Sequence, residues 1–214
     1  TGTLTLNAPV TVGAAGVVTV NAGAYILSTP PNLLSVQNTA PAAVVAGSAG
    51  YIVGALNWTL SNLGGSYTYT VGGSTALYNP ATLAYTGTGG GTTVEIQAFP
   101  TGSGGTAGAL MSPLTLSGTE YWRVTPSAVV NGATLTFNRT APALNGANIL
   151  GVTAPLAAAN TAYEVFPSTV VGANISNTTA FTTLAAGTRY YAVGTASVYA
   201  GFGALVKFAP ASNN

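Results

Sequence analysis

The chain has 214 residues and very little charge: Asp, Glu, Lys and Arg make up only 3% of it, against roughly a quarter in an ordinary soluble domain. His, Cys and Asp are absent altogether. Their absence excludes an imidazole base, a thiolate nucleophile, a disulfide and the usual zinc ligands. A carboxylate pair for acid–base chemistry would have to come from Glu95, Glu120 and Glu164, which are far apart in the sequence. The composition argues against an enzyme and implies no cofactor and no metal.

The scarcity of charge also restricts the partners. The four cations Arg123, Arg139, Arg189 and Lys207 cannot neutralise many phosphates, so we expect no nucleic acid partner. A net charge near zero removes repulsion between copies and favours association. The chain is therefore either a domain that happens to be neutral or one whose surface lies against other copies of itself. With few carboxylates to protonate, we also expect it to tolerate strong acid.

One apolar stretch, residues 41–56, is about as long as a short membrane span. It is rich in Gly and Ala, is interrupted by Ser48 and lacks flanking charge. We predict two buried strands joined by a Gly turn here, and no membrane span in the mature chain. The chain begins with Thr1 rather than Met, which is consistent with the removal of a leader. We therefore expect an extracellular protein on the cell surface.

Apolar and polar residues alternate with a period of two along most of the chain, and no sustained helical stripe interrupts them. At the start, one apolar face is formed by Leu4, Leu6, Ala8, Val10 and Val12. Similar patterns predict strands at residues 16–20, 67–71, 93–98, 121–125, 134–138, 162–166, 189–195 and 198–208. Gly pairs and Asn-Gly dipeptides mark turns between them. The predicted fold class is all-β, a β-sandwich of pilin-like or jelly-roll-like type.

We predict that residues 1–15 form an N-terminal strand and hinge and that residues 16–214 form the β-sandwich domain. The hinge is the Gly-Ala-Ala-Gly segment that begins at Gly13. Residues 100–108 (PTGSGGTAG) would be the boundary if the domain had two lobes. A single sandwich with a long loop at that point is the favoured arrangement.

The N-terminal strand is the most informative segment, because a one-faced apolar strand at a free end need not pair within its own chain. It can fill an open groove in the next copy and supply backbone hydrogen bonds to a sheet that lacks one strand. Head-to-tail insertion of this kind does not close on itself and produces a filament. Pro9 lacks an N–H group, so we expect the strand to be split around it.

Four Asn-X-Ser/Thr sequences are candidate acceptors of N-linked glycans, at Asn57, Asn138, Asn174 and Asn177. Glycans could supply the solubility that charge does not. Asn138 has an alternative interpretation as an ordinary residue of a buried or edge strand. The only lysine, Lys207, is either a surface cation or one half of an intramolecular isopeptide bond.

Several aromatic residues occur in the predicted strands: Tyr121, Trp122, Tyr163, Tyr190 and Tyr191. Flat aromatic rings stack on sugars, so these side chains could line a carbohydrate-binding groove. Aromatic residues in strands more often belong to the core or to an interface.

Taken together, the processed start, the TGTLTLNAPVTV strand, the near-total lack of charge, the sequons and the final ASVYAGFGALVKF strand resemble one group of proteins. These are the subunits of archaeal surface filaments joined by donor-strand complementation, namely threads of thermoacidophiles and bundling pili. The resemblance is one of character over the whole chain, without a signature motif. It implies adhesion, biofilm or cell–cell contact, glycan decoration and no catalysis.

We therefore expect the structural subunit of a self-assembling extracellular filament, whose partners are copies of itself. Two other classes stay open. A surface-layer or capsid-type lattice protein would also tile copies through neutral faces. A secreted carbohydrate-binding module would use the Tyr and Trp residues on an exposed face and remain monomeric.

Overall fold

The computed structural model describes residues 2–87, 90–108, 114–139, 144, 148–178 and 183–196. Over these residues the protein is an all-β sandwich, and its only helical element in this part of the chain is the 3-10 turn η1 (Pro41–Ala43). In chain order the strands are β1 (Gly2–Thr5), β2 (Val10–Val12), β3 (Val18–Thr19), β4 (Ala24–Ser28), β5 (Leu34–Val36), β6 (Val44–Val45), β7 (Tyr51–Thr59), β8 (Gly65–Tyr69), β9 (Val71–Ser74), β10 (Leu77–Tyr78), β11 (Ala81–Tyr85), β12 (Thr93–Phe99), β13 (Thr106–Ala107), β14 (Leu114–Leu116), β15 (Tyr121–Pro126), β16 (Val130–Asn131), β17 (Ala133–Asn138), β18 (Asn148–Thr153), β19 (Ala162–Phe166), β20 (Ser168–Val171), β21 (Asn174–Asn177), β22 (Thr183–Leu184) and β23 (Arg189–Ala196).

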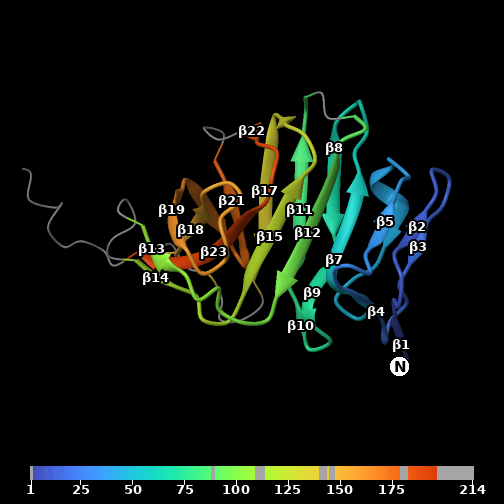
Figure 1. Ribbon diagram of the computed structural model, residues 1–214, viewed down its shortest axis with the longest axis horizontal. Helices are drawn as coiled ribbons and strands as arrows, with labels where there is room; N and C mark the ends of the chain where they lie inside the picture. The colour runs from blue at the N-terminus through green and yellow to red at the C-terminus, as the bar shows by residue number, and fades with distance from the viewer. Residues whose placement is uncertain are drawn as a thin grey trace, which may run out of the picture.

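Two sheets form the layers of the sandwich (Figure 1). The larger sheet has 14 strands, with the main order β1-β4-β7-β12-β15-β23-β18-β19-β13, and the smaller one has the order β20-β21-β17-β11-β8. Burial alternates along β15 and β17, as a strand with one face on the core requires. The period of two in the sequence therefore marks the faces that the two sheets turn toward each other.

Large aromatic side chains join the two sheets. Trp58 of β7 meets Tyr67 and Tyr69 of β8, with ring centroids 5.1 and 5.7 Å away. Trp122 of β15 lies 4.8 Å from Phe137 of β17. All five rings are fully buried, so each removes a large apolar area from water and fixes the spacing of the layers.

Residues 100–108 do not divide the core. β12, just before this segment, pairs directly with β15, which follows it. A single cluster of buried side chains contains residues from both sides, among them Trp58 and Trp122. Within the described residues, the chain forms one sandwich with a long connection at this point.

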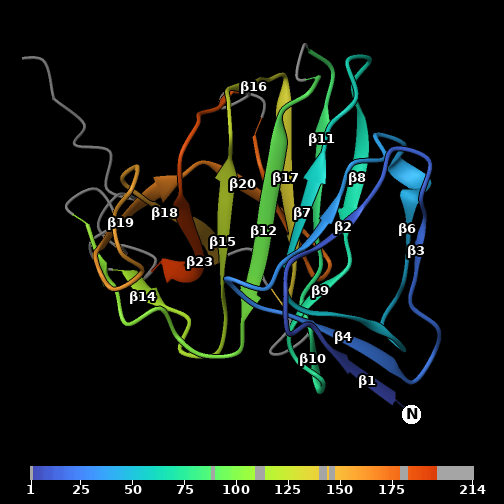
Figure 2. The ribbon, with the colours of Figure 1, turned by 45° about the vertical axis from the view of Figure 1, so that its right-hand side comes forward.

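The first strands are arranged differently from the rest, as parallel passes stacked at one end of the molecule. β1 runs parallel to β4, and β4 runs parallel to the first part of β7. β2 runs parallel to β5, and β5 to the second part of β7, while β3 and β6 form a separate parallel pair. We call residues 2–45 the N-terminal coils. In Figures 1 and 2 they lie at the end of the molecule opposite to β13, β14 and β19.

Most of the predicted strands are confirmed. β8, β12, β15, β17, β19 and β23 coincide, within a few residues, with predicted segments. Residues 41–56 contain the predicted two strands and Gly turn, closed by hydrogen bonds between Gly47 and Gly50, although β6 is short and β7 is long. The described residues contain no helix that is long and apolar enough to cross a membrane. The predicted strand at residues 198–208 lies outside the described residues.

Candidate functional site

The N-terminal segment predicted to be a donor strand lies on the sheet of its own chain. β1 pairs in parallel with β4, from Gly2 opposite Ala24 to Thr5 opposite Leu27, and β2 pairs in the same way with β5. The predicted Gly hinge is a tight turn, closed by a 2.9 Å hydrogen bond from the Gly16 N–H to the Gly13 carbonyl. The donor strand is thus not confirmed.

The strand is broken where Pro9 was expected to break it, since β1 ends at Thr5 and β2 begins at Val10. The apolar face predicted for this segment is only partly buried. Leu6 is in the core and Val12 packs against it, but Ala8 is exposed. Leu4 and Val10 are also exposed, at 59% and 39% of their surface. The segment is therefore attached to the protein by part of its apolar side chains, and the others remain accessible.

The outer side of β1 and β2 is an open sheet edge. The N–H groups of Gly2 and Leu6 donate to carbonyls of the β4 segment, at 3.0 and 3.1 Å. In a parallel ladder the alternate residues direct their N–H and C=O groups to the other side. The backbone groups of Thr3 and Thr5 thus point away from β4, and no strand within the described part of the chain pairs with them.

This edge has little of the protection that sheet edges usually carry. Soluble proteins place Lys, Pro or bulges on such strands to prevent pairing with other chains. Here only Pro9 interrupts the strand, and the first charged side chain of the sequence is Glu95. The whole of the N-terminal coils is therefore without a charged side chain.

Beside the edge, the end of the coils encloses an open hollow of about 400 Å³. Three segments border it: β1, the residues that follow β3, and β4. Its apolar wall includes Leu4, Val20 and Ile26. The polar lining consists of Thr and Asn side chains such as Thr19 and Asn21 together with Tyr25, and it includes no Asp, Glu, Lys, Arg or His. The hollow can therefore bury neutral, apolar side chains but offers nothing to hold a charged ligand.

The described carboxylates do not converge on one site. Glu95 pairs with Arg123 on the outer face of the larger sheet. Glu120 is buried beside Arg139, with 2.6 Å between Oε1 and Nε. Burial raises the pKa of Glu120 to about 7, and the positive charge of Arg139 opposes part of that shift. Among the described residues, no three His, Cys, Asp or Glu side chains are grouped as metal ligands.

All four candidate glycan acceptors lie on strands, and they differ in how far their side chains are buried. Asn57 is half-buried in the middle of β7, and its amide donates to Ser35 Oγ at 3.3 Å. Asn177 is only 6% exposed. Its Oδ1 accepts the Leu135 N–H, and its Nδ2 donates to the Ala133 carbonyl at 3.3 Å. The folded chain has no room for a glycan on Asn177.

The other two acceptors face each other on β17 and β21. The Asn138 amide donates to Asn174 Oδ1 at 2.8 Å, and Asn174 is exposed. Asn138 is half-buried. This agrees with its alternative interpretation as an ordinary residue of a strand. Asn174 is the candidate whose side chain is most accessible to a modifying enzyme.

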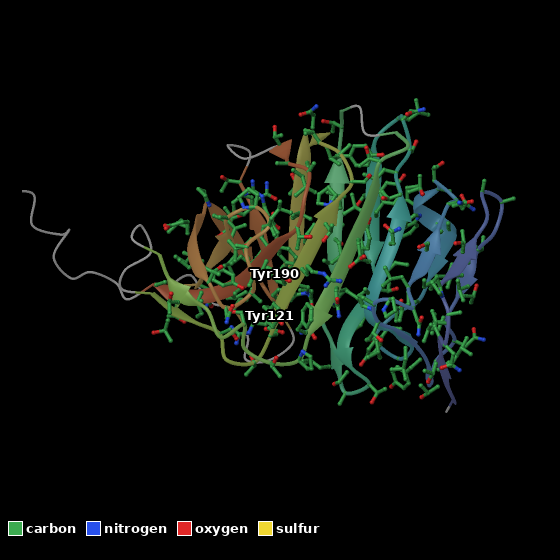
Figure 3. All side chains as sticks on the ribbon, viewed as in Figure 1. Tyr121 and Tyr190 are labelled. Atoms are coloured by element: carbon green, nitrogen blue, oxygen red, sulfur yellow. The ribbon has the colours of Figure 1, made fainter. Side chains whose placement is uncertain are left out.

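Three of the five aromatic residues considered for sugar binding are buried: Trp122, Tyr163 and Tyr191. Tyr121 and Tyr190 are half-buried on the outer face of the larger sheet, with ring centroids 6.0 Å apart (Figure 3). Phe99, which the sequence did not single out, stacks on Tyr121 at 4.3 Å. Its place opposite Tyr121 follows from strand pairing, which the sequence alone does not show.

Lys207, the candidate for an isopeptide bond, lies outside the described residues. Compared with known proteins, the chain matches no protein-family model, no curated protein and no solved structure.

Proposed function

We propose that the chain is the structural subunit of a self-assembling extracellular filament that serves adhesion or biofilm contact. The observation that carries this proposal is the open, uncharged sheet edge of β1 and β2, with the exposed Leu4 beside an apolar hollow. An unpaired edge is a template for a strand from another chain. A subunit that uses such an edge has no need of catalytic residues.

The position of the edge favours an open polymer. It lies at one end of the molecule, far from the strands at the other end of the same sheet (Figure 2). A contact between two different surfaces that does not close into a ring repeats without limit. The near absence of charge removes the repulsion that would otherwise oppose such stacking.

Residues 1–12 are the proposed joint between copies. In the predicted donor-strand mechanism, this segment leaves β4 and β5 and inserts into the next copy. Alternatively, it stays in place and accepts a strand from outside. In both mechanisms the partner is another copy of the chain.

Electron microscopy of the concentrated protein tests the function directly. We expect filaments, and we expect that deletion of residues 1–12 abolishes them and lowers the stability of the monomer. A peptide of that sequence, added in trans, should restore stability by covering β4 and β5. A wild-type protein that stays monomeric at all concentrations would refute the proposal. Flat sheets or shells would instead favour the surface-layer or capsid-type alternative.

A second candidate function rests on Tyr121 and Tyr190, which offer two neighbouring rings on one sheet face (Figure 3). Aromatic rings at such a position can stack on sugars in a secreted carbohydrate-binding module. This function requires a monomer that binds glycans on an array and loses binding in Tyr121→Ala and Tyr190→Ala variants. Exported chains of this kind would also carry N-linked glycans, for which Asn174 is the most accessible acceptor.

A further inference from the structure

We infer that copies join by strand addition: β1 and β2 stay on β4 and β5, while a second copy of this chain pairs along their outer side and closes the apolar hollow. This inference rests on the proposed function. It differs from the donor-strand mechanism because no strand has to leave its own sheet.

The first argument is that the N-terminal segment is held at several points along its length. Hydrogen bonds tie it to its own chain from the Gly2 N–H to the Val12 carbonyl, which accepts the Gln37 N–H at 2.9 Å. Leu6 is buried in the core, and the underlying Leu34 and Val36 are only 3% and 1% exposed. Withdrawal of the segment would break these bonds and expose this apolar surface to water. Addition of a strand to the outer side loses none of them.

The second argument is that the outer side repeats a contact that already exists within the chain. β4 adds in parallel to β7, and β1 adds in parallel to β4. The outward N–H and C=O groups of Thr3 and Thr5 can form hydrogen bonds with a further strand, as the backbone groups of β4 do with β1. On β2 the Val10 N–H donates to the Leu33 carbonyl at 2.9 Å, so Thr11 continues the same outward series. The outer side of β1 and β2 is thus a row of backbone hydrogen-bonding groups that no strand among the described residues pairs with.

The third argument concerns the occupant. Leu4 is 59% exposed and lines the hollow together with the half-buried Ile26 and the buried Val20, so an arriving strand would cover Leu4 and the remaining exposed surface of Ile26. Neither the edge nor the hollow carries an Asp, Glu, Lys, Arg or His side chain, so a charged partner would lose hydration without gaining an ion pair. The partner must be neutral and rich in alternating strands. A second copy of this chain, with 3% charged residues, meets that requirement.

A disulfide lock separates addition from exchange. Thr5 and Leu27 are opposite each other in the β1–β4 ladder, and the native chain has no Cys. In the Thr5→Cys/Leu27→Cys variant, oxidation of the monomer should link β1 to β4 within one chain. We expect the oxidised variant to form filaments as the wild type does, with only intramolecular disulfides on a non-reducing gel. Assembly that requires reduction, or a ladder of disulfide-linked chains after oxidation of filaments, would overturn the inference in favour of strand exchange.

An edge variant tests the outer side itself. Lys side chains on an edge strand prevent pairing with another chain, so Thr3→Lys/Thr5→Lys should raise the concentration needed for assembly at least about tenfold. The matched control is Thr86→Lys/Thr101→Lys, at exposed positions outside the strands. Unchanged assembly of the edge variant would overturn the inference. If the wild type itself forms no filament, the proposed function fails. If the wild type forms filaments and only the oxidised Thr5→Cys/Leu27→Cys variant does not, the inference of strand addition fails and the proposed function stands.

Discussion

The Nε atom of Arg139 lies 2.6 Å from Oε1 of Glu120, and both side chains are almost fully buried. The Asn79 amide donates to the second carboxylate oxygen of Glu120, and the Trp122 indole donates to the Asn79 carbonyl at 3.0 Å. Arg139 directly follows β17 of the smaller sheet, and Glu120 directly precedes β15 of the larger one. In a chain with so few charges, one buried ion pair therefore ties the two layers together.

Removal of the cation from this pair should be costly. In Arg139→Met, Glu120 keeps its buried carboxylate but loses the opposite charge, so we expect the free energy of unfolding to fall by about 3–5 kcal/mol. The control Arg123→Met removes the more exposed pair with Glu95 and should cost less than about 1 kcal/mol. Urea unfolding at about pH 8, where the carboxylate is ionised, measures both losses. Equal losses would contradict the structural role of the buried pair.

Stability should depend on pH through Glu120. Burial raises the pKa of this carboxyl group to about 7 in the folded protein, against 4.5 for the ordinary group. The folded state therefore binds a proton that the unfolded state releases between these two values, so the free energy of unfolding rises as the pH falls from about 7 to about 4.5. Below that range the gain is retained.

Urea unfolding across this pH range checks the trend, and Glu120→Gln, which cannot titrate, should flatten it. The same measurement tests the tolerance of acid expected from the composition. A sharp loss of structure between about pH 6 and about pH 2 would contradict both expectations.

Leu4 should matter for assembly and not for the fold of one chain. It is 59% exposed, so Leu4→Asp should change the free energy of unfolding of the monomer by less than about 0.5 kcal/mol. Between copies, however, the carboxylate would be buried without a partner, and the concentration needed for assembly should rise at least about tenfold. Sedimentation velocity measures this, with Leu63→Asp, at a 92% exposed loop position, as the control. Equal effects of the two variants would rule out burial of Leu4 between copies.

The two sequons at Asn174 and Asn177 should behave in opposite ways. Asn177→Ala leaves the buried N–H of Leu135 without its acceptor, so we expect a loss of about 1–3 kcal/mol in the free energy of unfolding. Asn174→Ala changes an exposed side chain and should cost much less. In a host that attaches N-linked glycans, mass spectrometry of peptides should find the glycan on Asn174 and none on Asn177. A glycan on Asn177 would show that modification precedes folding of β21.

The strands that alternate could be predicted because side-chain direction along a strand is a local property. β15 and β17, for example, bury every second residue, and the predicted bounds of both strands lie within one residue of the observed ends. β4 and β18 were not predicted. Their sequences, AYILS and NILGVT, are apolar on consecutive positions and show no period of two.

The candidate site was predicted only in part. The apolar face from Leu4 to Val12 and the break at Pro9 are visible in the sequence, but the identity of the strand beside them is not. Likewise, Tyr190 and Tyr191 are neighbours in sequence, yet one is half-buried on the outer face and the other is in the core. Which of them faces outward depends on the register between β15 and β23.

The amino-acid sequence by itself determined an all-β chain with almost no charge, because alternation and composition act locally and need no knowledge of the fold. Only the tertiary structure decided that residues 2–12 lie along β4 and β5, that their outer edge is open and that Asn177 is buried. Strand pairing joins segments that are distant along the chain, and the local alternation of apolar and polar residues does not identify the partner of each strand.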